Sequence, residues 1–140
     1  PQTTLKIGSS RIAAAICYEI AYPELVRKLS TDSDWLLTVS NDTWFSHSLA
    51  PAQHMQIARM RALENGRWLV RSTNNGLTAI VDPYGNITAQ APAYQKAVLS
   101  GSVEHRSGTT PYQKYGVAPV LLLGLLLIAG GFMRRQKGSS

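Results

Sequence analysis

The feature that most constrains the fold is an unbroken apolar segment near the C-terminus, residues 117–133. It reads VAPVLLLGLLLIAGGFM and contains no charged side chain. Its length, about 17 residues, is at the short end of the range an α-helix needs to span a bilayer. Tyr112 and Tyr115 precede it, where interfacial aromatic residues gather, and the basic cluster 134–137 follows it. We therefore predict a transmembrane helix over 116–133 rather than the buried core helix of a soluble protein.

The basic tail sets the expected orientation and localisation. Under the positive-inside rule, residues 134–140 lie in the cytoplasm, so residues 1–115 lie on the other side of the membrane. In a Gram-negative cell that side of the inner membrane is the periplasm. The chain begins at Pro1 rather than at a methionine, and 140 residues is about one domain. We expect a piece of a longer chain, with groups upstream of it missing.

The net charge of +6 does not predict nucleic-acid binding. Three of the basic residues crowd the C-terminal tail, and the others are scattered along the chain. No stripe of basic residues is interleaved with aromatic side chains that could stack on bases. No Cys/His cluster has the spacing of a zinc site, and no glycine-rich phosphate loop is present. We therefore expect no metal and no other cofactor.

Residues 1–115 have the pattern of an α/β domain. Short, mostly apolar runs predict buried strands, and a repeat of apolar residues every three to four positions predicts a helix over 52–65, capped by Gly66. The motif at 82–85 places Pro83 and Gly85 where a tight turn between two strands needs them. The expected strands are residues 12–16, 34–40, 68–72, 76–81, 86–90 and 97–104, and the other expected helix is 23–29.

The only cysteine, Cys17, ends the first apolar run and stands a few residues before the helix expected from Pro23. A strand that delivers a lone thiol to a sharp turn before a helix is how many enzymes present a nucleophile, because such turns favour the reactive thiolate. With no second cysteine, the thiol cannot form an internal disulfide. The competing interpretation is an inert buried cysteine, a common environment for this residue.

Three motifs resemble those of the nitrilase (carbon–nitrogen hydrolase) superfamily. ICYE at 16–19, followed by YPEL at 22–25, resembles its nucleophile region. ARMRALEN at 58–65 is similar to one of its helices, and VDPYG at 81–85 to one of its turns. The resemblance implies the C-terminal part of an αββα sandwich, with residues 1–115 as a partial catalytic domain. Of the superfamily's Glu, Lys and Cys catalytic set, only the cysteine matches a position here, Cys17.

Further segments resemble the apolipoprotein N-acyltransferase family of bacteria, which are multi-pass inner-membrane proteins of this superfamily. These segments are SNDTWF at 40–45, QHMQIARMR at 53–61, TNNG at 73–76 and TPY at 110–112, together with the terminal apolar helix. The resemblance implies an enzyme that moves an acyl chain from a phospholipid to the N-terminal amine of a diacylglyceryl lipoprotein. The membrane, a phospholipid donor and a lipoprotein acceptor are then the expected partners.

Four residues besides Cys17 are candidate site residues. Glu19, two positions from the thiol, is expected to orient the active-site network, and the backbone N–H of Tyr18 to bind an oxyanion. Asn41 and Trp44 follow a strand in a loop and are expected to bind substrate. The competing interpretations are a surface carboxylate for Glu19 and ordinary packing for the aromatic residues.

The remaining polar candidates carry weaker expectations. His47, His54 and His105 lie near no partner motif, so we do not expect a catalytic histidine. The basic residues Arg59, Arg61, Arg67 and Arg71 are interpreted mostly as solvated or ion-paired surface, with Arg61 and Glu64 three positions apart on one helix.

Two other functions stay open at this stage. One is a nitrilase-type amidase acting on a small amide, which would not need the terminal apolar helix. The other is a membrane-anchored remnant without activity, since the superfamily's Glu and Lys have no counterpart in this chain.

Overall fold

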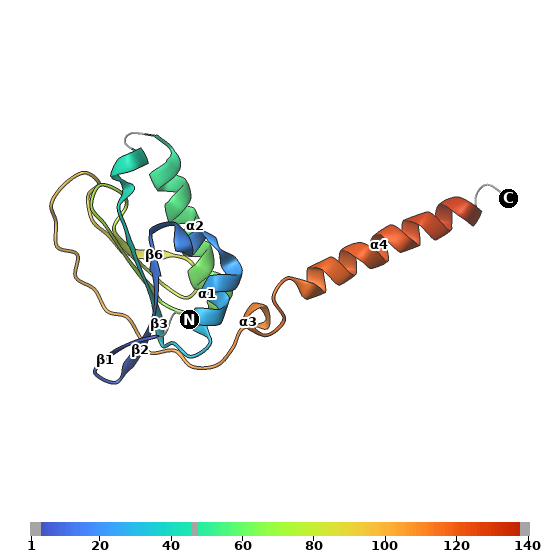
Figure 1. Cartoon of the computed structure of the whole chain (residues 1–140), viewed down its shortest axis with the longest axis horizontal. Helices are drawn as coiled ribbons and strands as arrows, with labels where there is room; N and C mark the ends of the chain where they lie inside the picture. The colour runs from blue at the N-terminus through green and yellow to red at the C-terminus, as the bar shows by residue number, and fades with distance from the viewer. Residues whose placement is uncertain (1–3, 46–47, 138–140) are drawn as a thin grey trace.

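The computed structural model describes residues 4–45 and 48–137. They build one six-stranded sheet whose spatial order follows the sequence, and the terminal helix extends from one end of this body (Figure 1). Strands β2, β3 and β4 are parallel to one another, whereas β1, β5 and β6 pair antiparallel at the two sides. The strands are β1 Leu5–Ile7, β2 Ser10–Ile16, β3 Trp35–Ser40, β4 Leu69–Thr73, β5 Ala79–Val81 and β6 Ile87–Gln90.

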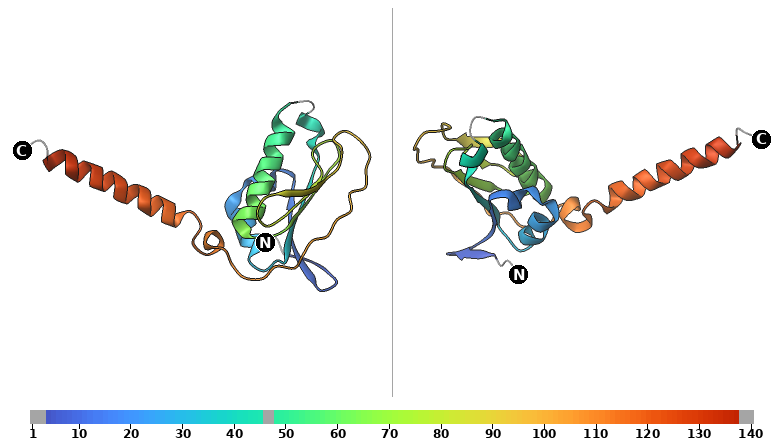
Figure 2. Two further views of the ribbon diagram at one scale, coloured as in Figure 1. Left: turned by 180° about the vertical axis from the view of Figure 1, so that it is seen from behind. Right: turned by 45° about the horizontal axis from the view of Figure 1, so that its top comes forward.

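Two helices cover one face of the sheet (Figure 2). Helix α1 (Pro23–Ser30) connects β2 to β3, and helix α2 (Ala50–Asn65) connects β3 to β4. Both connections join neighbouring parallel strands in the same sense, and such crossovers share one hand, so the two helices lie side by side on one face. A short 3-10 helix precedes each of them, η1 (Cys17–Ala21) before α1 and η2 (Asp42–Phe45) before α2.

The core lies between this sheet face and the helices. Alternate strand residues point into it, as the two-residue period of a strand requires. Small alanines on α2 and on β2 let the helix approach the sheet closely. Helix α2 ends where the sequence predicts, because Gly66 adopts φ +59 and its N–H bonds back to the carbonyls of Ala62 and Leu63. The buried apolar cluster comprises Ala13, Ala15, Ile20, Val26, Leu36, Met55, Ala58, Ala62, Leu69, Ala79 and Val81.

The segment expected as a last strand, 97–104, forms no strand, and that prediction is wrong. It runs as extended chain against the second face of the sheet, where Gly101 packs on the side chain of Ile80. A strand needs a neighbour for its backbone hydrogen bonds, and none of the described strands pairs with this segment. Near the Cys17 end of this face, Ile16 and Val39 stay 61% and 42% exposed.

Helix α3 (Pro111–Tyr115) fastens the C-terminal region to the body. The side chains of Thr110 and Gln113 form a capping box at its start. Gln113 Nε2 donates to Ser30 Oγ at 3.1 Å, and Arg27 Nη1 donates to the Gln113 carbonyl at 2.7 Å. Thr110 Oγ1 donates to the carbonyl of Glu64. These bonds place α3 at the C-terminal ends of α1 and α2.

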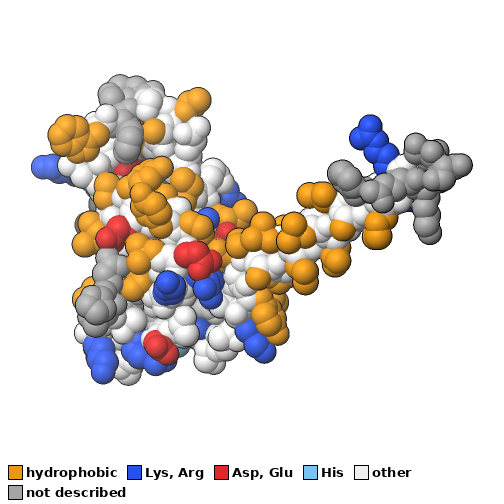
Figure 3. Space-filling model, turned by 45° about the vertical axis from the view of Figure 1, so that its right-hand side comes forward, with side chains coloured by type: hydrophobic (Ala, Val, Ile, Leu, Met, Phe, Trp, Pro, Cys, Tyr) orange, Lys and Arg blue, Asp and Glu red, His pale blue; other side chains and the backbone are white. Residues whose placement is uncertain are grey.

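Helix α4 (Ala118–Lys137) projects away from the body and packs against none of it (Figures 1 and 2). Its residues Ala118–Arg135 have a mean hydropathy of 1.6, and none of this stretch is buried. Figure 3 shows hydrophobic side chains along the helix and basic ones near its end. Among the described residues, it is the one helix long and apolar enough to cross a membrane.

Candidate active site

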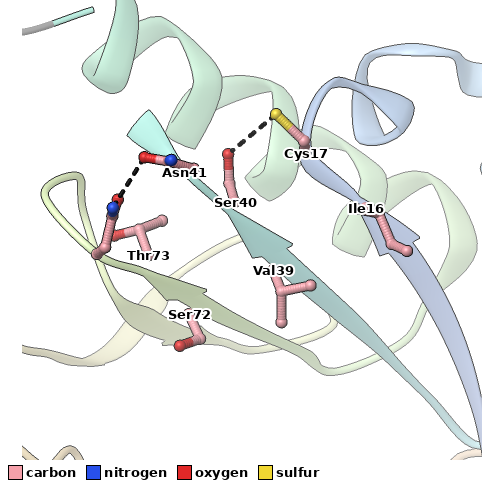
Figure 4. A pocket seen from close by; sticks show the side chains of 8 residues that line it. Ile16, Cys17, Val39, Ser40, Asn41, Ser72 and Thr73 are labelled. Atoms are coloured by element: carbon pink, nitrogen blue, oxygen red, sulfur yellow. Dashed lines mark hydrogen bonds between the residues drawn. The ribbon is translucent and has the colours of Figure 1, made fainter. Parts of the chain in front are cut away.

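Cys17 stands at the C-terminal end of β2, at the first position of η1. Its φ is +54, a value that a residue with a side chain rarely adopts, so the chain turns sharply at the thiol. We call residues 16–19 the Cys17 turn. The thiol is partly exposed and faces an open pocket of about 500 Å³ at the ends of β2, β3 and β4 (Figure 4). The pocket is lined by Ile16, Cys17, Val39, Ser40, Asn41, Ser72, Thr73 and Asn74.

Glu19 braces the Cys17 turn. Its Oε2 accepts a hydrogen bond of 2.7 Å from the backbone N–H of Ile16, so the carboxylate closes the turn from within. The interaction satisfies a donor that the end of a strand would otherwise leave without a partner. The structure therefore places Glu19 beside the Cys17 thiol as a group that holds the backbone.

This bond leads to a prediction for two variants of Glu19. Glu19→Ala should lower the free energy of unfolding by about 1.5–3 kcal/mol, the worth of a hydrogen bond to a charged group. Glu19→Gln keeps an oxygen that can accept from Ile16 and should lose clearly less. Denaturant unfolding of both variants checks this, and equal stability of Glu19→Ala and the wild type would show that the bond does not hold the turn.

Ser40 connects the thiol to a buried carboxylate. Ser40 Oγ lies 3.6 Å from Cys17 Sγ and 2.6 Å from Asp42 Oδ1. A hydroxyl has one proton to donate, and the short contact to the carboxylate is the stronger bond. Ser40 therefore donates to Asp42, and its lone pairs remain available to the thiol proton of Cys17.

Asp42 belongs to a buried cluster beneath the Cys17 turn. Its Oδ2 accepts from Arg71 Nη2 at 2.8 Å, and both side chains are fully buried. The same Arg71 nitrogen lies 3.1 Å from His54 Nδ1, and His54 Nε2 lies 3.2 Å from the carbonyl oxygen of Cys17. We call Asp42, His54 and Arg71 the buried triad. Gly76 packs directly on the Asp42 carboxylate, where a Cβ atom would clash.

The electrostatics of the buried triad keep His54 neutral. Burial lowers the pKa of His54 below 6.5, and the positive charge of Arg71 lowers it further, while Asp42 opposes both effects. Burial also lowers the pKa of Arg71. An arginine begins so far above neutral pH that its guanidinium stays charged. The triad thus consists of one ion pair and one neutral imidazole.

The other predicted site residues differ in whether they line the pocket beside Cys17. Asn41 lines the pocket, and its Oδ1 accepts from Asn74 Nδ2 at 2.8 Å and from the Thr43 N–H at 3.1 Å. Tyr18 is 56% exposed and borders a second cavity of about 230 Å³ on the far side of the turn. Trp44 is 85% exposed and lines neither cavity. Cys17 and Asn41 therefore share the pocket, Glu19 braces the neighbouring turn without lining the pocket, and Trp44 stands apart.

Sequence reasoning missed Ser40 and the buried triad. Arg71 is buried against the site, so the interpretation of it as surface is wrong. Arg67 is also buried, and its guanidinium donates to the carbonyls of Ser33 and Gly108. The expected ion pair of Arg61 with Glu64 is confirmed at 3.1 Å, but Arg61 is buried as well, so its interpretation as surface is wrong.

His105 does not join the site. His105 lies near Ser10 and Asp34, and His47 falls outside the described residues. Within 4–45 and 48–137, no group of three His, Cys, Asp or Glu side chains gathers that could hold a metal ion. The chemistry available at the pocket is therefore that of a thiol, hydroxyls and amides.

The arrangement is that of an α/β domain that presents a cysteine thiol at a strand-to-helix turn. Residues 1–112 match the carbon-nitrogen hydrolase family. The chain belongs to this family. Its fold matches that of a carbon-nitrogen hydrolase from Helicobacter pylori G27 with a TM-score of 0.63 and 16% identity, over 69% of this chain and 41% of that one. The predicted fold class, the C-terminal part of a nitrilase-like sandwich, is confirmed.

Two relatives with similar sequences have names that are more specific than that of the family. The chain is 49% identical to apolipoprotein N-acyltransferase of Azotobacter vinelandii over 96% of its own length and 26% of the relative's. The apolipoprotein N-acyltransferase of Pseudomonas aeruginosa is also 49% identical, over the same shares of both chains. The chain thus spans about a quarter of the length of the relatives it matches.

Proposed function

We propose that this chain supplies the nucleophile of an N-acyltransferase that moves an acyl chain from a phospholipid to the N-terminal amine of a diacylglyceryl lipoprotein. The observation that carries the proposal is the thiol of Cys17 at a strained turn over an open pocket, in a chain about half identical to apolipoprotein N-acyltransferases. The exposed apolar helix α4 adds support, because both substrates are lipids that reside in a membrane.

The chemistry proceeds in two steps through a thioester. The Cys17 thiolate attacks the ester carbonyl of the phospholipid, the carbon–oxygen bond breaks, and the lysophospholipid leaves with a proton. The amine of the lipoprotein then attacks the thioester carbonyl, and the carbon–sulfur bond breaks. An amide forms as the attacking nitrogen gives its proton to a base and the thiolate is released. Dividing the reaction lets two large substrates use one pocket in turn, so ping-pong kinetics are expected.

We assign the site residues as follows. Cys17 is the nucleophile, the backbone N–H of Tyr18 binds the oxyanion, and Glu19 holds the turn. Asn41, fixed by Asn74 and Thr43, borders the pocket that receives the donor's reacting ester. We propose that Trp44 contacts the lipid part of a substrate, and its exposure beyond the pocket supports this role. The reaction also needs a base for the thiol and further donors for the oxyanion, and the family resemblance implies a Glu and a Lys for this work.

We further propose that α4 spans the inner membrane of a multi-pass parent protein, with the basic tail in the cytoplasm and residues 1–115 in the periplasm. The cluster Arg134-Arg135 at the end of an otherwise uncharged helix supports this orientation. The domain boundaries are then 1–115, 116–133 and 134–140.

Intact-mass spectrometry of the complete gene product tests the function. After incubation with phospholipid in detergent, the protein should gain the mass of a fatty acyl group that hydroxylamine removes. Cys17→Ala should gain none. If wild-type Cys17 stays unmodified, the amidase and the inactive remnant become the functions to examine, and small amides are the next substrates.

A further inference from the structure

No member of the buried triad lines the open pocket, and His54 borders the second cavity beside Tyr18. The triad nevertheless touches the backbone of the proposed nucleophile through His54. The carbonyl oxygen of Cys17 is held by His54, which lies at 4% exposure on the first half of α2. Arg71 and Asp42 hold the other side of the same imidazole ring, at 3.1 Å and 3.4 Å from Nδ1. A turn with φ +54 at a cysteine persists only where its surroundings hold it.

The hydrogen bonds define which nitrogen of His54 carries the proton. A carbonyl oxygen can only accept, so Nε2 donates to Cys17. Arg71 can only donate, so Nδ1 accepts from it. The neutral ring with its proton on Nε2 satisfies both neighbours at once. Asp42, whose Oδ2 binds Arg71, keeps that guanidinium turned toward the ring.

The carbonyl of Cys17 and the N–H of Tyr18 belong to one peptide group. That group is planar and trans, so its C=O and its N–H point in opposite directions. When His54 holds the carbonyl toward α2, the Tyr18 N–H is turned away from α2. This N–H is the donor to which we assign the oxyanion of the tetrahedral intermediate. Oxyanion donors act only when they are already aimed at the developing charge.

We propose that His54, held by Arg71 and Asp42, is a positioning residue that aims the Tyr18 N–H at the oxyanion by fixing the Cys17 carbonyl. This inference rests on the proposed role of Cys17 as the nucleophile of acyl transfer. His54 takes no proton from the thiol, because both of its ring nitrogens are already engaged.

Protonation of His54 disrupts this arrangement. A second proton on Nδ1 would meet the Arg71 guanidinium instead of accepting from it. The groups that face the ring are Arg71 from β4, Asp42 from η2, and Cys17 and Tyr18 from η1, with the Tyr18 ring centred 6.2 Å away. Of these, Asp42 and the Cys17 carbonyl favour the charged ring, whereas burial and the charge of Arg71 disfavour it more strongly. Repulsion between the charged ring and Arg71 should displace the ring, so we expect aiming to weaken as the pH falls through the lowered pKa of His54.

The test compares two reactions of the same thiol in the complete gene product. Acylation of Cys17 by a p-nitrophenyl acyl ester passes through an oxyanion, whereas alkylation by iodoacetamide does not. In His54→Asn, the side-chain amide lies near the former Nδ1 and is too short to donate to the Cys17 carbonyl. In His54→Gln, the longer side chain brings an amide N–H near the former Nε2, where it can still donate to that carbonyl. We expect His54→Asn to slow acylation by about 100-fold, the worth of one oxyanion donor, and alkylation by less than about threefold. His54→Gln should restore most of the acylation rate.

The outcomes separate the inference from its alternatives. Equal losses in both reactions, or no loss in acylation, would overturn it. Should His54→Asn fail to fold, the pH profile decides. At pH values below 6.5, where His54 gains its second proton, the rate of acylation relative to alkylation should decrease in the wild type. The same ratio should stay constant with pH in His54→Gln. A ratio that stays constant in both proteins would overturn the inference. Acylation by the p-nitrophenyl ester without acylation by phospholipid would contradict the proposed function and leave this inference standing.

Discussion

Replacing Cys17 with alanine is expected to abolish acyl transfer, with a loss of about 10⁴-fold or more in kcat/KM. The thiol forms the bond that divides the reaction into two steps, and no second cysteine in the chain can replace it. The hydroxyl of Ser40, 3.6 Å from Sγ, is directed to Asp42 and is a poor substitute nucleophile. Steady-state transfer from phospholipid to a diacylglyceryl peptide measures the effect.

The control for this variant is Gln90→Ala, an exposed position on the edge strand β6. It should transfer at the wild-type rate, and the thermal unfolding of both variants should match the wild type. Residual transfer by a folded Cys17→Ala protein within tenfold of the wild type would remove Cys17 from the mechanism.

Replacing Arg71 with methionine is expected to lower the free energy of unfolding by about 3–5 kcal/mol. Methionine fills most of the volume but leaves the Asp42 carboxylate buried without its cation, and an uncompensated buried charge is costly. The bond from Arg71 to His54 is lost as well. Denaturant unfolding of the detergent-solubilised protein measures the change.

The matched variant is the double substitution Arg71→Met with Asp42→Asn. It removes both charges, so no unpaired ion remains, and it should regain at least half of the lost stability. A double variant as unstable as Arg71→Met would show that the lost stability comes from altered core packing and not from the unpaired Asp42 carboxylate.

The elements with strong local patterns could be predicted from the sequence. Strand β2 and helix α2 were predicted within two residues of their bounds, because their apolar spacing and the stop at Gly66 are local signals. The segment 97–104 has apolar residues typical of a strand, but strand formation depends on a partner that local sequence does not reveal. The short strand β1 gave too weak a pattern for prediction.

The residues of the candidate site likewise fall into those with a local sequence signal and those without one. Cys17 and Glu19 could be found because they lie two residues apart in one motif. The buried triad could not, because Asp42, His54 and Arg71 come from three elements and meet only when the parallel strands align. Its one local signal is an arginine within the apolar run LVRS at 69–72, since a charge in a buried strand requires a partner.

The fastening of α3 has a mechanical consequence. The bonds of Gln113 to Ser30 and of Thr110 to the Glu64 carbonyl grip α1 and α2 at their C-terminal ends, whereas the Cys17 turn lies at their opposite ends. A force applied to α4 acts first on these anchoring hydrogen bonds and is then transmitted along the axes of α1 and α2. The anchoring bonds lie far from the thiol, so the Cys17 turn is insulated from movements of α4.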